Sequence, residues 1–135
     1  MSSLNKIRAD IEAHLNTLTG LPQVAFDNVP YEQQLDTTYL RTNFAPTSTR
    51  PIVRGPNPQQ RYQGFFSILI CVPENLGSGS AYSLADSICS HFQVHDALGA
   101  VAPFVNIEYV EVASGFNDAP FFCLPVTVGW FAHGQ

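Results

Sequence analysis

The first apolar residues of the chain recur at every third or fourth position, as they do along one side of an amphipathic helix. Charged side chains fill the other side of the same segment. Gly20 and Pro22 predict where this helix ends, because glycine is common just after a helix and proline cannot continue one. One side of the helix should therefore pack on the rest of the protein, through Leu4, Ile7, Ile11, Leu15 and Leu18.

Alternation of apolar and polar residues predicts strands in much of the remaining sequence. The clearest strand runs from Arg61 to Val72 and is apolar on both faces, which is typical of a central strand or of one that a partner covers. The alternation in Val105–Val112 slips by one residue, which predicts either a β-bulge or a strand that is buried on both sides toward its end. Pro125 predicts an edge position or a bulge in the last strand, because proline has no N–H to donate. The predicted strands are residues 24–26, 38–44, 61–72, 105–112 and 121–132.

A second helix is predicted over residues 81–92, where small and apolar residues again share one side. It follows a flexible Gly-Ser loop at residues 73–80. Residues 45–60 carry four prolines and predict a long connection, with a short extended piece at Ile52–Arg54. The order α-β-β-β-α-β-β indicates a single α+β domain over residues 1–135, with two helices packed on one mixed or antiparallel sheet of about four to five strands.

Composition adds an expectation about the surface. Charged residues make up 13% of the chain, about half the usual fraction of roughly 25%, whereas hydrophobic residues reach 45%. These values exclude a disordered chain and predict that other protein covers part of the surface. The longest weakly polar stretch, residues 119–132, is shorter than the roughly 20 residues that a membrane span needs. The net charge of −5 argues against binding to nucleic-acid phosphates.

The cysteines and histidines indicate no active site. Cys71, Cys89 and Cys123 are far apart in the sequence and lie in apolar runs, which predicts buried thiols in a reducing compartment. His91 and His95 are spaced as two zinc ligands on a helix would be, but the metalloprotease pattern needs a glutamate directly after the first histidine, and none is present. We therefore expect two imidazoles near a helix C-terminus, where positive charge is favoured, and no metal site.

Two further patterns lack the residues that their chemistry needs. Gly77–Ser80 precedes the second predicted helix as a phosphate-binding loop would, but the lysine of such a loop is absent. Glu108 and Glu111 fall on opposite faces of the predicted strand, so they form no pair for acid–base catalysis. We therefore predict a protein that is not an enzyme, with no catalytic residues, no metal ion and no cofactor.

Positive charge is concentrated in one segment. Residues 41–61 hold four arginines and no acidic residue, whereas the remaining 114 residues hold two positive and eleven negative side chains. The arginines could pair with carboxylates of their own domain, or they could contact an acidic surface of another subunit. Nucleic-acid binding is a weaker option, because the segment has few aromatic residues to stack on bases. We predict a subunit or partner interface at this segment and the Gly-Ser loop, comprising Arg41, Arg50, Arg54, Arg61, Asn75, Ser78 and Ser80.

Four segments taken together resemble a known family. They are Thr38–Phe44, Arg61–Pro73, the Gly-Ser loop that leads into Ala85–Ile88 and Phe92, and Pro125–Trp130. In this order and spacing, together with the N-terminal helix and the segment Asn28–Pro30, they resemble the tail terminator-like proteins of long-tailed bacteriophages. The resemblance extends over nearly the whole chain.

The resemblance implies a structural protein of the virion, assembled in the cytoplasm of a bacterial host into a hexameric ring. Such a ring would cap the head-proximal end of the tail tube, end tube polymerisation and join the tail to the head connector. Its partners would be further copies of itself, the tail tube protein and a head-closure or connector protein. It would not bind a membrane. Genome DNA would pass through the lumen without specific binding, which agrees with the acidic lumen that we expect from the negative charge outside the arginine-rich segment.

Two alternatives stay open at the level of sequence. The chain could be another neck subunit, such as a head-closure protein, whose ring sits at a different position. It could also be a small ligand-binding α+β domain with a pocket between helix and sheet, for which Cys71, His91, His95 and Tyr109 are the polar candidates. A solution mass near roughly six subunits would favour the ring, and ligand-dependent melting of a stable monomer would favour the pocket.

Overall fold

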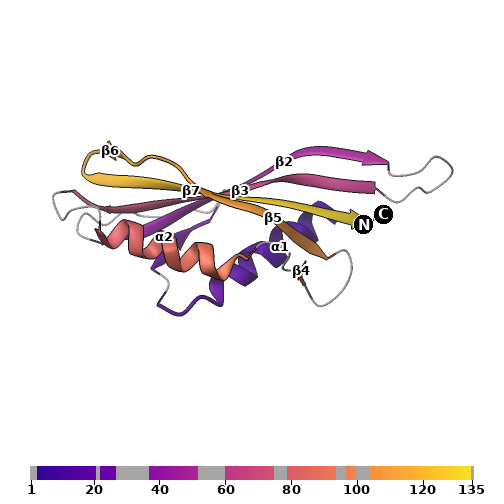
Figure 1. The fold of residues 1–135 in the computed structure, drawn as a ribbon, viewed down its shortest axis with the longest axis horizontal. Helices are drawn as coiled ribbons and strands as arrows, with labels where there is room; N and C mark the ends of the chain where they lie inside the picture. Colours follow the sequence, from indigo (N-terminus) through magenta and orange to yellow (C-terminus); the bar gives the residue numbers. More distant parts are fainter. Residues whose placement is uncertain are drawn as a thin grey trace.

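The protein combines two helices with one mixed sheet, as the sequence predicts (Figure 1). A computed structural model describes residues 3–20, 22–26, 37–51, 60–74, 79–93, 97–99 and 104–134. The sheet order is β1-β2-β3-β7-β5-β4, with β6 also paired to β7. β1 and β2 are parallel, and every other neighbouring pair is antiparallel. The elements are α1 (Ser3–Asn16), β1 (Gln23–Ala25), β2 (Tyr39–Pro51), β3 (Gln60–Pro73), α2 (Gly79–His91), β4 (Ala97–Leu98), β5 (Val105–Val112), β6 (Phe116–Asp118) and β7 (Phe121–Gly134).

The predicted α+β class and the predicted order of the main elements are confirmed, but the strand count is wrong. The described sheet has seven strands instead of four to five. The two additional strands are β4, with two residues, and β6, with three. Strands this short leave almost no alternation to detect, which is why the pattern of the sequence does not predict them.

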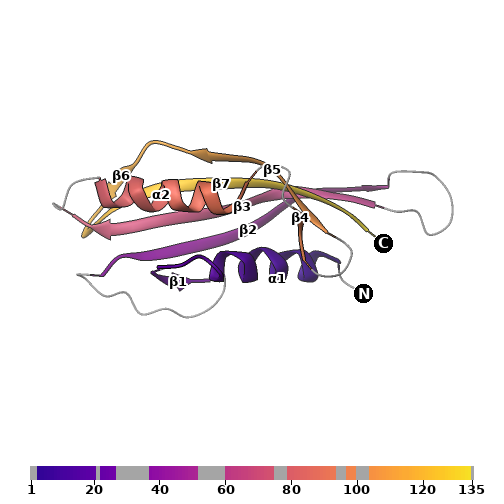
Figure 2. The ribbon, with the colours of Figure 1, turned by 60° about the horizontal axis from the view of Figure 1, so that its bottom comes forward.

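Both helices pack on the same face of the sheet (Figure 2). The predicted stripe of α1 is confirmed, since Ile7, Ile11 and Leu15 are fully buried. The even-numbered residues of β3 and β7 point toward the helices and supply nearly half of the buried residues of the main core. Trp130 is fully buried in this core and stacks on the Phe44 ring, with 5.2 Å between ring centroids and an interplanar angle of 7°. A single core therefore holds the helices and the central strands together.

The opposite face of the sheet carries the odd-numbered residues of β3 and β7, and no helix of the described chain covers it (Figure 2). A second, smaller cluster of buried side chains lies on this face, where the first residues of β2 and β7 meet the end of β3. Nearer the middle of the sheet, Phe65 and Leu69 are half-buried. The sheet therefore has one face packed against helices and one face with a mixture of apolar and polar side chains. The second cluster consists of Tyr39, Cys71, Phe121 and Cys123.

The predicted long connection over residues 45–60 is wrong for its first half. β2 continues to Pro51 and pairs with β3 down to Gln60, so the two strands form a hairpin that extends beyond the helices (Figure 1). Prolines misled the prediction because they are rare in paired strands. Here Pro46 lies at a register shift, and beyond the segment paired with β1 no strand of the described chain pairs with the other side of β2. The expected extended piece at Ile52–Arg54 lies outside the described residues.

Two finer predictions concern β5 and β7. The bulge predicted in β5 is confirmed by a register shift between Ile107 and Tyr109. Pro125, however, lies in a central strand instead of an edge strand. Pro125 lies between the part of β7 that pairs with β6 and the part that pairs with β5. Its carbonyl accepts a hydrogen bond of 3.0 Å from the Ala113 N–H. The missing N–H of the proline therefore falls where the sheet edge is locally open.

Candidate functional site

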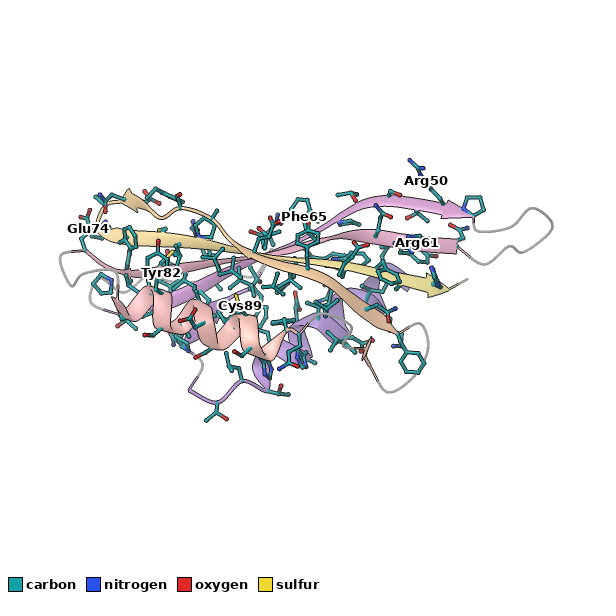
Figure 3. The ribbon with its side chains drawn as sticks, in the orientation of Figure 1. Arg50, Arg61, Phe65, Glu74, Tyr82 and Cys89 are labelled. Carbon is teal, nitrogen blue, oxygen red and sulfur yellow. The ribbon has the colours of Figure 1, made fainter. Side chains whose placement is uncertain are left out.

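Arg50 and Arg61, two of the predicted interface residues, lie directly opposite each other across β2 and β3. They occupy the end of the hairpin farthest from α2 (Figure 3). We call residues 45–51 and 60–65 the arm. Like charges that face each other across an antiparallel pair repel, so this arrangement costs stability unless other groups compensate for it.

Arg61 is compensated within its own domain. Its Nη2 atom lies 3.5 Å from the Glu108 carboxylate, and its Nε atom donates a hydrogen bond of 3.2 Å to the Gln63 side chain. Its guanidinium carbon is also 4.3 Å from the centroid of the Phe131 ring, a cation–π arrangement. The Arg61 side chain is therefore turned toward β5 and β7, as an arginine with a structural role would be.

Arg50 has no comparable compensation. It is exposed at the end of β2 and forms no ion pair with any residue that the structure describes. Residues 52–59, which follow it, contain Arg54 and no acidic side chain, although Arg54 itself lies outside the described residues. The end of the arm is thus a basic surface with an arginine that is available to a partner.

The remaining predicted interface residues do not join this surface. Arg41 is exposed nine residues earlier in β2, about 30 Å from Arg50 along an extended strand. Ser80 is exposed in the first turn of α2, toward the end of the sheet opposite the arm. Asn75 and Ser78 lie outside the described residues. The predicted residues therefore occupy at least two separate regions instead of one site.

The acidic side chains near the other end of the sheet complement the arm. Asp118 is exposed in β6, and Glu74 is half-buried at the end of β3. Figure 3 places Glu74 at the end of the molecule opposite Arg50. One end of the sheet is therefore basic, and the other carries two carboxylates together with Arg41.

Exposed aromatic side chains are further functional candidates, of which the sequence analysis considered Tyr109 alone, and only as a polar group of a ligand pocket. Tyr82 of α2, Tyr109 of β5 and Phe116 of β6 are 45%, 38% and 46% exposed. Tyr109 lies against Gly129, where an added Cβ atom would overlap the tyrosine ring. A glycine inside a strand often marks such a close approach, so Gly129 is the signal that could have identified this position. Large exposed aromatic groups are enriched where proteins contact partners.

The histidines have a structural role. His91, which was a candidate for zinc or ligand binding, stacks on His14 of α1 with 4.2 Å between ring centroids. His95 lies outside the described residues, and no group of three or more potential metal ligands occurs in the part of the chain that the structure describes. A hollow of about 450 Å³ beside His91 is lined by Leu18, Asp86, Ser87 and Ser90. It opens on the surface next to α2 and no strand residue lines it, so it differs from the pocket between helix and sheet that the ligand-binding alternative predicts.

Comparison with known proteins identifies the family. The family model described as phage tail terminator protein matches residues 6–130. The chain belongs to the phage tail terminator protein family. Membership in this family makes the protein a structural component of the phage tail, which implies a role that is not enzymatic.

Solved structures give a consistent fold for this tail terminator family member. One similar structure has a TM-score of 0.78 at 20% sequence identity, and the match covers 98% of this chain and 96% of the other. At this identity the similarity demonstrates a shared fold. No curated protein sequence matches the chain. Neither helix in the described ranges is both long and apolar enough to span a membrane.

Proposed function

We propose that the protein forms a hexameric ring that caps the head-proximal end of the tail tube, ends tube polymerisation and joins the tail to the head connector. The family match over residues 6–130 is the observation that carries this proposal. The ring would assemble in the cytoplasm of the bacterial host and become part of the neck of the virion. Its partners would be other copies of the chain, the tail tube protein and a head-closure or connector protein. Genome DNA would pass the predominantly acidic subunits without specific binding.

The charge distribution supports a particular contact between copies. The end of the arm with Arg50, together with Arg54 of the segment that follows it in the sequence, would meet the carboxylates of Glu74 and Asp118 on the neighbouring subunit. Such a contact joins two different surfaces, and head-to-tail contacts of this kind generate rings when the rotation between copies closes. It would also give Arg50, which faces Arg61 across the strand pair, the opposite charge that it lacks in the described part of a single subunit. Arg41, Ser80, Asn75 and Ser78 would lie at a second contact, on a ring face or between subunits.

Charge reversal on the arm tests this function. Arg50→Glu combined with Arg54→Glu should prevent completion of tails when phage are produced with the variant, which electron microscopy of the particles would reveal. The isolated variant should keep its fold, because a carboxylate in place of the Arg50 side chain would face Arg61 and replace a repulsive pair with an attractive one. The matched control is Arg8→Glu on α1, since Arg8 bonds to Glu12 and Asn5 of its own helix. Normal tails with the arm variant would contradict the proposed contact.

A second experiment separates the contact from the general function. Glu74→Lys combined with Asp118→Lys should also prevent tail completion, and joining these two changes to the arm reversal should restore it in part. Rescue would require that the two ends of neighbouring subunits meet. Full tails produced without any copy of this protein would contradict the capping function itself. Failure of the rescue alone, with the single reversals still inactive, would contradict only the head-to-tail arrangement.

A further inference from the structure

Two of the three cysteines lie together on the face of the sheet without helices. Cys71 of β3 and Cys123 of β7 are direct register partners, and their Sγ atoms are 3.3 Å apart, with the Cys123 thiol donating to the Cys71 sulfur. Each residue is 1% exposed. Residues 52 positions apart in the sequence are thus brought within contact distance by the central strand pair. Cys89 lies on α2 and packs against the other core.

The backbone arrangement suits a covalent link between these strands. The Pro125 carbonyl is bonded on the β5 side, so the backbone groups of Pro125, and of Cys123 two residues earlier, point away from β3. Cys71 and Cys123 therefore form a pair without mutual backbone hydrogen bonds. In such pairs the Cα atoms are typically about 4.5 Å apart, which lies within the roughly 4.4–6.8 Å that disulfides span.

The surroundings of the pair slow its oxidation. The Tyr39 and Phe121 rings belong to the same buried cluster and meet edge to face, with centroids 5.2 Å apart. Burial, reinforced by the neighbouring Cys71 thiol, raises the pKa of Cys123 to about 12. Because the thiolate is the reactive form, the raised pKa slows the reaction of Cys123 with any oxidant, whereas burial excludes a bulky disulfide more than a small oxidant.

We propose that Cys71 and Cys123 form an oxidation site for peroxides, at which the two thiols become a disulfide that links β3 to β7. One sulfur attacks an oxygen of hydrogen peroxide, the O–O bond breaks, and a sulfenic acid and one water are produced. The second sulfur then displaces the hydroxyl group of the sulfenic acid, which leaves as a second water. Two electrons and two protons thus pass from the thiols to the peroxide. This proposal does not depend on the proposed function.

The experiment uses the full chain in its native state, treated with hydrogen peroxide, quenched, unfolded and alkylated with iodoacetamide. Apart from the mass of the alkyl groups, the treated chain should be about 2 Da lighter than the untreated chain, because disulfide formation removes two hydrogens. One cysteine of the treated chain should be alkylated, compared with three in the untreated chain. Peptide mapping should find Cys71 joined to Cys123 and Cys89 alkylated, and a reductant should reverse the change. The oxidised protein should also melt at a higher temperature than the reduced protein, because the link constrains the unfolded chain.

Two variants control the result. Cys89→Ser should form the same disulfide at the same rate, and Cys123→Ser should lose it, with circular dichroism used to check that each variant folds. Three alkylated cysteines in the treated wild-type protein would overturn the proposal. Disulfides through Cys89, or sulfonic acids at Cys71 and Cys123 in place of the link, would overturn it as well. These outcomes are read from the wild-type chain, so they do not depend on the folding of any variant.

Discussion

His14 and His91 bind each other's helix ends. Their rings stack with an interplanar angle of 14°, and the Nε2 atom of each ring lies within hydrogen-bond distance of the other residue's backbone carbonyl, at 2.8 Å and 2.6 Å. A carbonyl only accepts, so both Nε2 atoms must carry the proton and donate it. The last carbonyls of a helix lack donors within the helix. Here the histidine ring of each helix donates to a carbonyl near the end of the other helix. The C-terminal ends of α1 and α2 are therefore held together although the sequence separates them widely.

Replacing His91 with alanine should destabilise the protein by about 1–2 kcal/mol, because the change removes a ring stack and a hydrogen bond and leaves the His14 carbonyl with a weaker set of donors. Urea unfolding at neutral pH would measure the effect. His14→Ala should cost a similar amount, and the double variant should cost less than the sum because the two residues act as a pair. The control is His133→Ala at the exposed end of β7, which should change stability by less than about 0.5 kcal/mol. Equal effects of His91→Ala and His133→Ala would argue against the clamp.

Two glycines of the sheet should respond differently to alanine. At Gly64 an added Cβ would meet the backbone of Ala45 and the Cα atom of Pro46, at 2.7 Å from the latter, so the strands of the arm would have to move. Gly64→Ala should therefore cost about 2–3 kcal/mol. At Gly129 the obstacle is the exposed Tyr109 ring, which can rotate into solvent, and the cost should stay below about 1 kcal/mol. Thermal unfolding of both variants tests the contrast, and a larger loss for Gly129→Ala would refute it.

Thr42 offers a stabilising change. It faces the helices, is 6% exposed, and its hydroxyl finds no hydrogen-bond partner in the described part of the chain. Valine has nearly the same shape without the buried hydroxyl, so Thr42→Val should raise the free energy of unfolding by about 1 kcal/mol. Thr127→Val on the half-buried opposite face is the matched control and should be close to neutral. A destabilised Thr42→Val variant would mean that the hydroxyl has a partner after all.

Alkaline pH should weaken the fold through Cys123. Burial raises the pKa of this thiol from 9.0 to about 12, so the folded state holds its proton at pH values where the unfolded state releases it. The contribution of the protonated Cys123 thiol to the free energy of unfolding is complete below pH 9. It is lost as the pH rises toward 12, by at most about 1.4 kcal/mol per pH unit. Under reducing conditions, urea unfolding at about pH 8 and about pH 10.5 should show the stability difference between wild type and Cys123→Ala shrinking at the higher pH. A stability difference that is the same at both pH values would show that burial does not raise the pKa of the Cys123 thiol.

The sequence predicts the elements that its periodicity encodes and misses the contacts that only the fold creates. The stripe in α1 and the slip in β5 both correspond to observed features, since each depends on neighbours in the chain. The arm was mistaken for a loop because local proline content outweighed the pairing that β3 provides. The His14–His91 and Arg50–Arg61 pairs could not be found, because register and helix packing bring them together over long sequence separations. The concentration of arginines was visible in the sequence, but which arginine is compensated by Glu108 was not.

The construction of the arm has a mechanical consequence. All 14 residues of β3 pair with β7, and the arm is simply the outer portion of β2 and β3, without a hinge of its own in the described residues. A force that pulls on the arm along the strand direction must slide β3 past β7, so it loads the whole hydrogen-bond ladder in shear instead of opening one bond after another. Tension at this point would therefore be shared by the centre of the sheet and passed to the opposite end of the molecule with little deformation on the way.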